Sequence, residues 1–399
     1  MTGASSARAR SVRTVVVAAA LLWLAGNALR ITILAVPPVI PLIRDEFALN
    51  ATQIAILSSI PLALLGLAAL VGSLLVARLG LIGALVGGLL LVAGGSALRG
   101  LASGYAMLVL TTIVMCAGVA IMQPIMPGAV RQWMPGRIGL GTAIYTNGLL
   151  AGEVFAVLFT IPLVLPGVDG SWRASFVVWA IPVALVALVV WIYAPRPASA
   201  SVGPAFVPHK WLPDWHLGLV WRLGALFLCI NAIYFGANTF IPIYFKSEER
   251  ADLITGALVG LNFGQIPASL LILAFARHLE GRAWPFIVSG VLSITGLAGL
   301  VLTVGAMSKW WAALIGFADA GALILGLALP ALLCKPEDVA RTAAGTFTLS
   351  YGGAMIVAIA CGAAWDLSGR PALAFVPLGV CALALMAGAT VLRGKGNLT

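Results

Sequence analysis

Three charged side chains, Arg30, Glu153 and Asp319, lie deep inside long apolar stretches of the sequence. A charge at the centre of a lipid bilayer costs at least about 2.5–3.5 kcal/mol, so such residues are few and face the interior of a helix bundle. The guanidinium of Arg30 keeps its proton and presents a planar fork of donors that suits carboxylate-like anions. Three roles therefore fit Arg30. It anchors a bound anion, it is a permanent ion-pair partner of Glu153, or it exchanges its ion pair with Glu153 for a bound anion.

The surroundings of the two carboxylates predict different roles for them. Glu153 either gains and loses protons or is simply the counter-charge of Arg30. Gly148 and Gly152 precede it as a small-xxx-small pair, which predicts close approach of another helix. Asp319 is flanked by small residues, which favours gating or helix pairing over contact with a bound solute.

Amide and aromatic side chains recur in the same apolar stretches. Each alone is more often an interhelical hydrogen bond than a ligand contact. Asn27 lies one turn before Arg30, on the same helix face. Together they predict a polar path through the bundle, lined by Asn27, Gln123, Tyr145, Asn147, Tyr234, Asn238, Asn262, Gln265 and Tyr351.

The composition explains where these residues must sit. The 399 residues are 61% hydrophobic and 9% charged, with a mean hydropathy of +1.08, whereas soluble domains are about a quarter charged. The solvent is therefore lipid. The net charge of +10 would suggest nucleic acid in a water-soluble chain, but here it reflects Lys and Arg retained in cytoplasmic loops, and no nucleic-acid partner is expected.

A membrane span needs roughly 20 mostly apolar residues. Twelve such windows occur, at about 14–43, 52–77, 83–103, 106–131, 138–165, 172–194, 217–245, 252–276, 284–306, 309–333, 341–365 and 372–392. The proline-rich stretch 195–216 reads as a cytoplasmic linker between six-helix bundles at 14–194 and 217–393, with short tails at 1–13 and 394–399. The first apolar run is too long for a signal peptide and is read as a retained helix.

Basic residues orient the spans. Fifteen Lys and Arg fall in the segments on the side of the N-terminus and seven in those on the opposite side. This asymmetry predicts that both termini are cytoplasmic.

The two bundles also resemble each other in sequence. Four matched features are shifted by 201, 206, 203 and 197 residues: 40–46 with 241–248, Pro61 with Pro267, Pro127 with Pro330, and Arg173 with Arg370. A near-constant shift is what parallel repeats of a transporter produce. Prolines are expected to interrupt two spans, at Pro37 and Pro38 and at Pro124 and Pro127, as bending points for gating or as packed kinks.

No catalytic or metal-binding pattern is present. The sequence has no GxSxG, HExxH or phosphate-binding loop, its three His lie in or beside loops, and its five Cys form no cluster. We therefore expect no enzyme activity, no metal and no cofactor, and transport driven by gradients.

Two six-helix halves with a basic loop between spans 2 and 3 resemble the major facilitator superfamily over the whole chain. In the loop 72–80, Arg78 and Gly80 match the family and Ala77 replaces its usual Asp, so the resemblance implies a gating role for Arg78 with a weakened network. The stretches 26–30, 36–41 and 117–127 are similar to the cyanate/nitroimidazole transporter family. That likeness implies uptake or exchange of small anions or compact polar heterocycles.

The sequence therefore predicts an all-α polytopic membrane protein of the major facilitator fold, with two pseudo-symmetric six-helix bundles. Its expected function is secondary transport, by alternating access, of a cyanate-like anion, small carboxylate or nitroimidazole-like solute anchored by Arg30, coupled to a proton or counter-anion. The alternative is proton-coupled efflux of neutral drugs or metabolites, with Arg30 structural. Drug/proton antiporters carry Gly-Pro where this chain has Gly152-Glu153, which counts against efflux. A third hypothesis is a sensor or membrane enzyme, which the lack of a soluble domain in the sequence disfavours.

Overall fold

The chain is helical throughout the part that the structure describes. The computed structural model describes residues 2–135, 137–195, 215–279, 281–303, 305–334 and 339–389, and no strand occurs among them. A helix satisfies its backbone hydrogen bonds within one segment, which hydrocarbon requires of a spanning chain. The predicted all-α class is confirmed.

Two compact units make up the chain. Unit 1 comprises Met1–Val36 and Leu67–Ala205, and unit 2 comprises Pro37–Gly66 and Phe206–Thr399. Residues 37–66 thus group with unit 2, although the sequence places them inside the predicted bundle 14–194. Most of the predicted linker 195–216 and the tail 394–399 lie outside the described residues, and the bundle boundaries stay a prediction.

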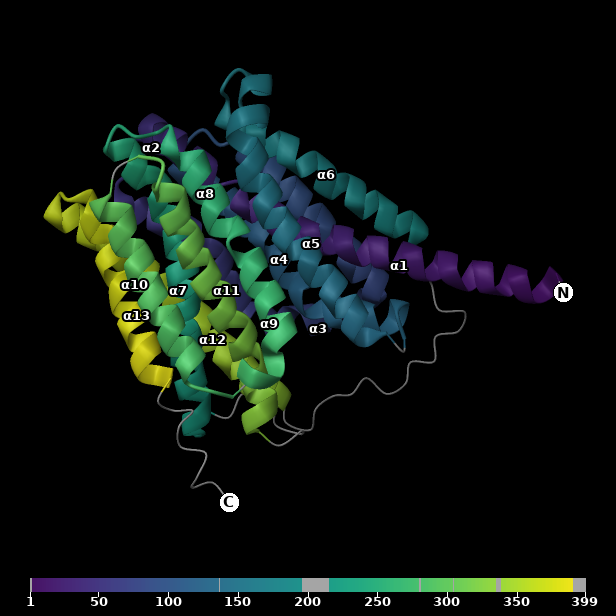
Figure 1. The fold of residues 1–399 in the computed structure, drawn as a ribbon. Helices are drawn as coiled ribbons and strands as arrows, with labels where there is room; N and C mark the ends of the chain where they lie inside the picture. The colour runs from purple at the N-terminus through teal and green to yellow at the C-terminus, as the bar shows by residue number, and fades with distance from the viewer. Residues whose placement is uncertain are drawn as a thin grey trace. The chain divides into compact units, whose positions relative to one another are not determined.

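Unit 1 is built around α1. Its elements are α1 (Thr2–Leu34), the part of α3 (Ala51–Arg99) beyond Gly66, α4 (Tyr105–Trp133), α5 (Ile138–Phe159), the π-turn η2 (Thr160–Val164), the 3-10 turn η3 (Pro166–Val168) and α6 (Trp172–Tyr193). α1 packs along α5 and beside α6 (Figure 1). Residues 2–13 of the predicted tail 1–13 are the helical beginning of α1.

Unit 2 is built around α7. Its elements are η1 (Pro37–Val39), α2 (Ile40–Phe47), the first part of α3, α7 (Gly218–Ser247), α8 (Leu253–Phe263), α9 (Gln265–Leu279), α10 (Trp284–Leu302), α11 (Ser308–Leu333), α12 (Val339–Ser368), η4 (Pro371–Phe375) and α13 (Val376–Gly388). α7 packs along α12, and α8 along α11 (Figure 1). Most of α7 is buried, as its near-continuous apolar sequence requires.

Eleven helical segments in the described residues are long and apolar enough to cross a membrane. Each coincides with one of the predicted spans. The remaining prediction, 52–77, falls on the first part of α3, where Ala51–Gly66 is a shorter apolar helix. Hydropathy alone therefore located the membrane-crossing elements.

The prolines behave differently in the two spans they were expected to interrupt. α1 ends at Leu34, and Pro37 and Pro38 begin a buried 3-10 turn, so that interruption is confirmed. The predicted break at Pro124 and Pro127 is wrong, because the backbone of α4 stays helical through both to Trp133. In a membrane helix, neighbouring groups can satisfy the carbonyl that a proline leaves unbonded, so the helix continues.

Two other boundaries differ from the predicted spans. The predicted loop between spans 2 and 3 is a turn at Gly80, whose φ of 70° lies in the left-handed region that glycine adopts freely, within the otherwise helical α3. The predicted span 252–276 is two helices, α8 and α9, that meet at Gly264.

Candidate functional site

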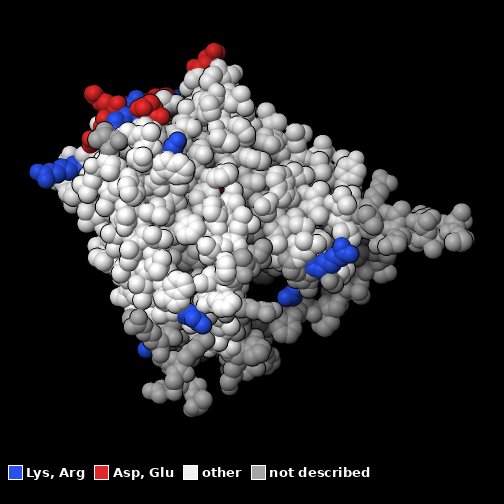
Figure 2. Space-filling model, in the orientation of Figure 1, with Lys and Arg blue, Asp and Glu red and all other residues white. Residues whose placement is uncertain are grey.

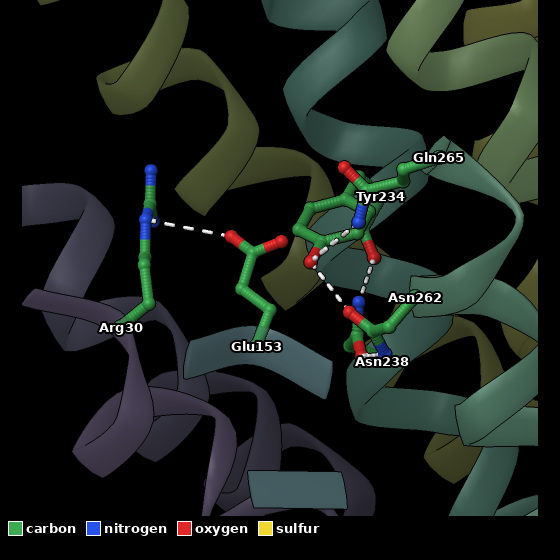
Figure 3. Close-up of polar contacts among 6 residues, drawn as sticks. All are labelled: Arg30, Glu153, Tyr234, Asn238, Asn262 and Gln265. Atoms are coloured by element: carbon green, nitrogen blue, oxygen red, sulfur yellow. Dashed lines mark hydrogen bonds and ion pairs between the residues drawn. The ribbon is translucent and has the colours of Figure 1, made fainter. Parts of the chain in front are cut away.

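Arg30 and Glu153 form an ion pair inside unit 1. The Nε of Arg30 lies 3.5 Å from Oε1 of Glu153, and only 13% and 7% of the two side chains are exposed (Figure 3). Neither residue is near the end of its apolar span, Val15–Phe47 or Leu140–Val164. The direct pair, one of the alternatives open from sequence, is therefore present.

Close approach of α1 and α5 places the two charges together. A Cβ added at Gly152 would lie 2.5 Å from the carbonyl oxygen of Asn27, and one at Gly148 would clash with the carbonyl of Trp23. Gly26 faces the Tyr145 carbonyl of α5 in the same way. The predicted small-xxx-small contact is confirmed, and Glu153 directly follows the second of its glycines.

Two other predicted site residues in unit 1 have a polar atom that no described residue hydrogen-bonds. The Nδ2 of Asn27 and the Oε1 of Gln123 are buried and have no hydrogen-bond partner among the described residues. A buried polar group without a partner costs free energy comparable to a lost hydrogen bond. A donor one turn from Arg30 and an acceptor on α4 are thus available to a polar solute.

Tyr145 and Asn147 of α5 lie on the side of the contact with α1. Tyr145 is half-buried, and the exposed Asn147 accepts a hydrogen bond from the indole Nε1 of Trp23 at 2.9 Å. This bond joins α5 to α1, so helix pairing accounts for Asn147 without a solute.

A second polar cluster, buried in unit 2, joins α7, α8 and α9 (Figure 3). Gln265 Nε2 donates to the Tyr234 hydroxyl at 3.2 Å, and that hydroxyl donates to Asn262 Oδ1 at 2.7 Å. Asn262 Nδ2 donates to Asn238 Oδ1 at 3.0 Å, and Asn238 Nδ2 donates to the Tyr234 carbonyl at 3.1 Å. Four of the predicted site residues therefore form one hydrogen-bonded chain.

The cluster of Tyr234, Asn238, Asn262 and Gln265 carries no formal charge, and this determines which solutes it can recognise. Amides and a phenol offer donors and acceptors without a formal charge, and Asn238 and Asn262 are 2% and 1% exposed. Buried networks of this kind hold each member in one orientation. The cluster suits a compact polar solute, whereas the Arg30–Glu153 pair of unit 1 suits an anion.

Replacing Tyr234 with Phe is expected to destabilise the protein by about 1–3 kcal/mol, because the hydroxyl links Gln265 and Asn262 and its loss leaves their polar groups unpaired. Thermal or denaturant unfolding of the purified variant measures the change. Tyr193→Phe is the control, since Tyr193 is exposed at the end of α6. Equal stability of the two variants would contradict a cooperative network.

The remaining predicted residues make contacts of other kinds or are exposed. Tyr351 stacks on Phe347 at 6.0 Å between ring centroids. Asp319 is 4% exposed in α11, and Gly316, about one turn earlier, faces the Leu261 carbonyl of α8, so the two helices pack closely near it. Arg78 and Pro127 are exposed, and the side chain of Pro124 lies outside those described. No group of three or more His, Cys, Asp or Glu in the described residues could hold a metal ion.

Arg99 and Asp366 are two polar residues that the sequence did not single out. Arg99 is fully buried at the end of α3, donates to the Thr32 carbonyl and the Ser96 hydroxyl at 3.0 Å, and lies 4.2 Å from the Phe176 ring centroid. Asp366, near the end of α12, binds the beginning of α3. Both stand at span ends, where charged residues are ordinary, so the sequence carries no signal for them.

Comparison with known proteins agrees with the helical architecture and with a membrane role. The family model of the Major Facilitator Superfamily matches residues 22–359. The chain is 26% identical to the cyanate transport protein CynX of Escherichia coli K12 over 77% of this chain and 79% of that protein. It is also 26% identical to the 2-nitroimidazole transporter of the same strain, with 83% of each chain covered.

Solved transporter structures share the fold. The nucleoside transporter NupG superposes with a TM-score of 0.74 at 13% identity, covering 95% of this chain and all of that one. A POT family transporter in complex with a conjugated peptide gives 0.74 at 14% identity, over 95% and 96% of the two chains. Identities this low establish the fold, a multi-pass helical membrane protein, and nothing about the cargo.

Proposed function

We propose that this chain, which belongs to the Major Facilitator Superfamily, is a secondary active transporter of a small anion or compact polar solute. It would act by alternating access in the cytoplasmic membrane of a bacterium, with both termini in the cytoplasm. The relatives that transport cyanate and 2-nitroimidazole support this solute class.

The ion pair of Arg30 and Glu153 is the observation that carries the proposal. A guanidinium in a bilayer keeps its charge and needs a negative partner at every stage. In the structure that partner is the carboxylate of Glu153, at 3.5 Å. An anionic solute offers the same oxygen or nitrogen acceptors and can take the place of Glu153 beside Arg30.

The displaced carboxylate would then provide the coupling. Once a bound anion neutralises Arg30, Glu153 is a second negative charge in a largely buried site, and binding a proton removes the repulsion. A solute anion and a proton would thus bind together. Alternatively, the transported anion would be exchanged for a counter-anion, which would neutralise Arg30 equally and would need no proton.

Neighbouring polar atoms would orient the solute. Among the described residues, Asn27 Nδ2 is an unused donor one turn from Arg30, and Gln123 Oε1 an unused acceptor. One fixed charge with a few amides favours a small solute over a large one.

Uptake into proteoliposomes tests the proposal. We expect saturable uptake of radiolabelled cyanate or 2-nitroimidazole, inhibited by small carboxylates, above that of protein-free liposomes. An inward proton gradient should stimulate uptake if Glu153 couples protons, and a trans-side anion should do so if exchange operates. Absence of saturable uptake for both compounds and for small carboxylates would contradict the proposed solute class.

Proton-coupled efflux of neutral compounds remains the alternative. It is favoured by one observation: Arg30 already has a carboxylate partner and could be permanently structural. Under this alternative, efflux of uncharged compounds would persist when both charges are replaced together by neutral amides.

A further inference from the structure

Arg99, the last residue of α3, is a permanent cation enclosed by protein. Its side chain is fully buried, whereas the charged side chains that Figure 2 shows lie in small groups on a largely uncharged surface. A guanidinium keeps its proton in a protein. A buried charge is costly unless an opposite charge or well-placed dipoles compensate it. Arg99 therefore needs from its surroundings the compensation that surface cations obtain from water.

No carboxylate of unit 1 supplies this compensation. The sequence of unit 1 contains only two acidic residues, Glu153 and Asp169. Glu153 pairs with Arg30, and Asp169 is exposed in the turn before α6. Among the described residues, Arg99 forms no ion pair. Its full positive charge is thus not matched by a full negative charge of the chain.

Dipoles and an aromatic ring compensate part of the charge. Nη2 of Arg99 donates to the Thr32 carbonyl and to the Ser96 hydroxyl, both at 3.0 Å, which uses both of its hydrogens. The Phe176 ring centroid lies 4.2 Å from Cζ and covers one face of the guanidinium. Thr32 is in the last turn of α1, so the C-terminal ends of α1 and α3 both direct partial negative charge toward Arg99.

Three buried donor groups remain unused at this place. Nε and Nη1 of Arg99 and the hydroxyl of Thr32 have no hydrogen-bond partner among the described residues, and Thr32 is 0% exposed. A helical Thr commonly donates to the carbonyl four residues earlier, as Thr112 does to Leu108 at 2.7 Å. The Thr32 hydroxyl does not, although the carbonyl of the same residue binds Arg99. Buried donors without acceptors indicate a missing acceptor.

The surroundings of Arg99 are electropositive, which favours an anion as that acceptor. Arg173, at the beginning of α6, donates from Nε and Nη2 to the Ala102 carbonyl at 3.1 and 2.9 Å, three residues beyond Arg99. A Cβ added at Gly100 would lie 2.7 Å from the Arg173 carbonyl oxygen, so the end of α3 and the beginning of α6 are in contact. A helix N-terminus adds partial positive charge. A neutral water would satisfy hydrogen bonds here but would not balance the charge.

We propose that Arg99 and the Thr32 hydroxyl bind a small monovalent inorganic anion of the halide class, such as chloride, as a resident structural ligand of unit 1. A halide supplies one full negative charge, and, being spherical, it accepts N–H and O–H donors from any direction. The donors are shielded from solvent, which disfavours larger anions. Arg99 ends its apolar span, Arg78–Arg99, so the ion can reach it without crossing the bilayer centre.

This ion is distinct from the transported solute, which the proposed function places at Arg30. The inference therefore does not depend on transport. Its failure would leave the proposed function standing, and a failure to transport cyanate or 2-nitroimidazole would leave the halide site standing.

Thermal unfolding of the purified protein tests the halide site. In sodium chloride or bromide, we expect the unfolding midpoint to rise saturably, by at least about 2 °C, relative to sodium gluconate of equal ionic strength. The reason is that a ligand bound only by the folded state stabilises that state. A midpoint that depends on ionic strength alone would overturn the proposal and would show that dipoles suffice to compensate Arg99.

Thr32→Val removes one proposed ligand and keeps the carbonyl that holds Arg99. We expect the half-saturating halide concentration to rise about tenfold, because one hydrogen bond to a charged group is lost. Thr239→Val is the matched control, since Thr239 is a buried helical Thr whose hydroxyl already donates to the Phe235 carbonyl at 2.8 Å. Equal halide affinity in the two variants would exclude Thr32 as a ligand. Arg99→Gln is expected to lose the halide response altogether.

Two measurements locate the ion. The variant Arg30→Gln/Glu153→Gln should keep the wild-type halide response, and loss of the response there would place the ion at Arg30 and overturn the proposal. Crystals grown in sodium bromide should show an anomalous-scattering peak beside the guanidinium of Arg99. A halide response without a peak at Arg99 would also overturn it.

Discussion

Replacing Arg30 with Gln is expected to abolish saturable uptake of an anionic solute and to destabilise the fold. Removing one partner of a buried ion pair leaves the other charge without compensation, at a cost of about 3–5 kcal/mol, and Glu153 is 7% exposed. The solute loses a charge-assisted contact, which weakens apparent binding by about 2–5 kcal/mol. Unfolding of the purified protein and initial rates of cyanate uptake measure the two effects.

Arg99→Gln is the matched control for Arg30→Gln. Arg99 is also a buried Arg of unit 1, but it contacts the Thr32 carbonyl and the Ser96 hydroxyl. We expect this variant to lose stability and to keep its KM for uptake. Wild-type KM and rate in Arg30→Gln would show that Arg30 does not bind the solute.

Gly152→Ala is expected to destabilise the protein by about 1–3 kcal/mol and to lower uptake with it. The added methyl would lie 2.5 Å from the Asn27 carbonyl oxygen, so α1 and α5 must move apart, and the separation carries Glu153 away from Arg30. The midpoint of unfolding and the uptake rate of the same preparation test both consequences.

Gly87→Ala is the control for this substitution. Gly87 is also helical and lies in unit 1, but nothing lies within 4 Å of a Cβ added there. Helix propensity alone then predicts a gain of up to about 1 kcal/mol. An equal gain in Gly152→Ala would contradict the close approach of α1 and α5.

Features that depend on local sequence were predictable. Apolar runs located the spans because a bilayer demands about 20 apolar residues in a row. Gly148 and Gly152 predicted a close helix contact because small residues four apart share a helix face. Arg30 and Glu153 were predictable as site residues because charges inside such runs are costly. The structure places their charged groups 3.5 Å apart.

Features that depend on partners distant in the sequence could not be predicted. Asp366 binds Ala51, 315 residues away, and nothing in either local sequence indicates the contact. The grouping of residues 37–66 with unit 2 has the same origin, since packing and not connectivity decides it. α4 stays helical through Pro124 and Pro127. Neighbouring groups can satisfy the carbonyls that prolines leave unbonded in a membrane helix, and a single segment does not reveal whether they do.

Uptake by the double variant Arg30→Gln/Glu153→Gln tests the central claim most directly. Replacing both charges with neutral amides leaves neither one buried alone, so stability should recover toward that of the wild type. The account predicts a folded protein without saturable cyanate uptake. A folded double variant that takes up cyanate with wild-type KM would show that the pair of Arg30 and Glu153 is structural and that the anion binds elsewhere.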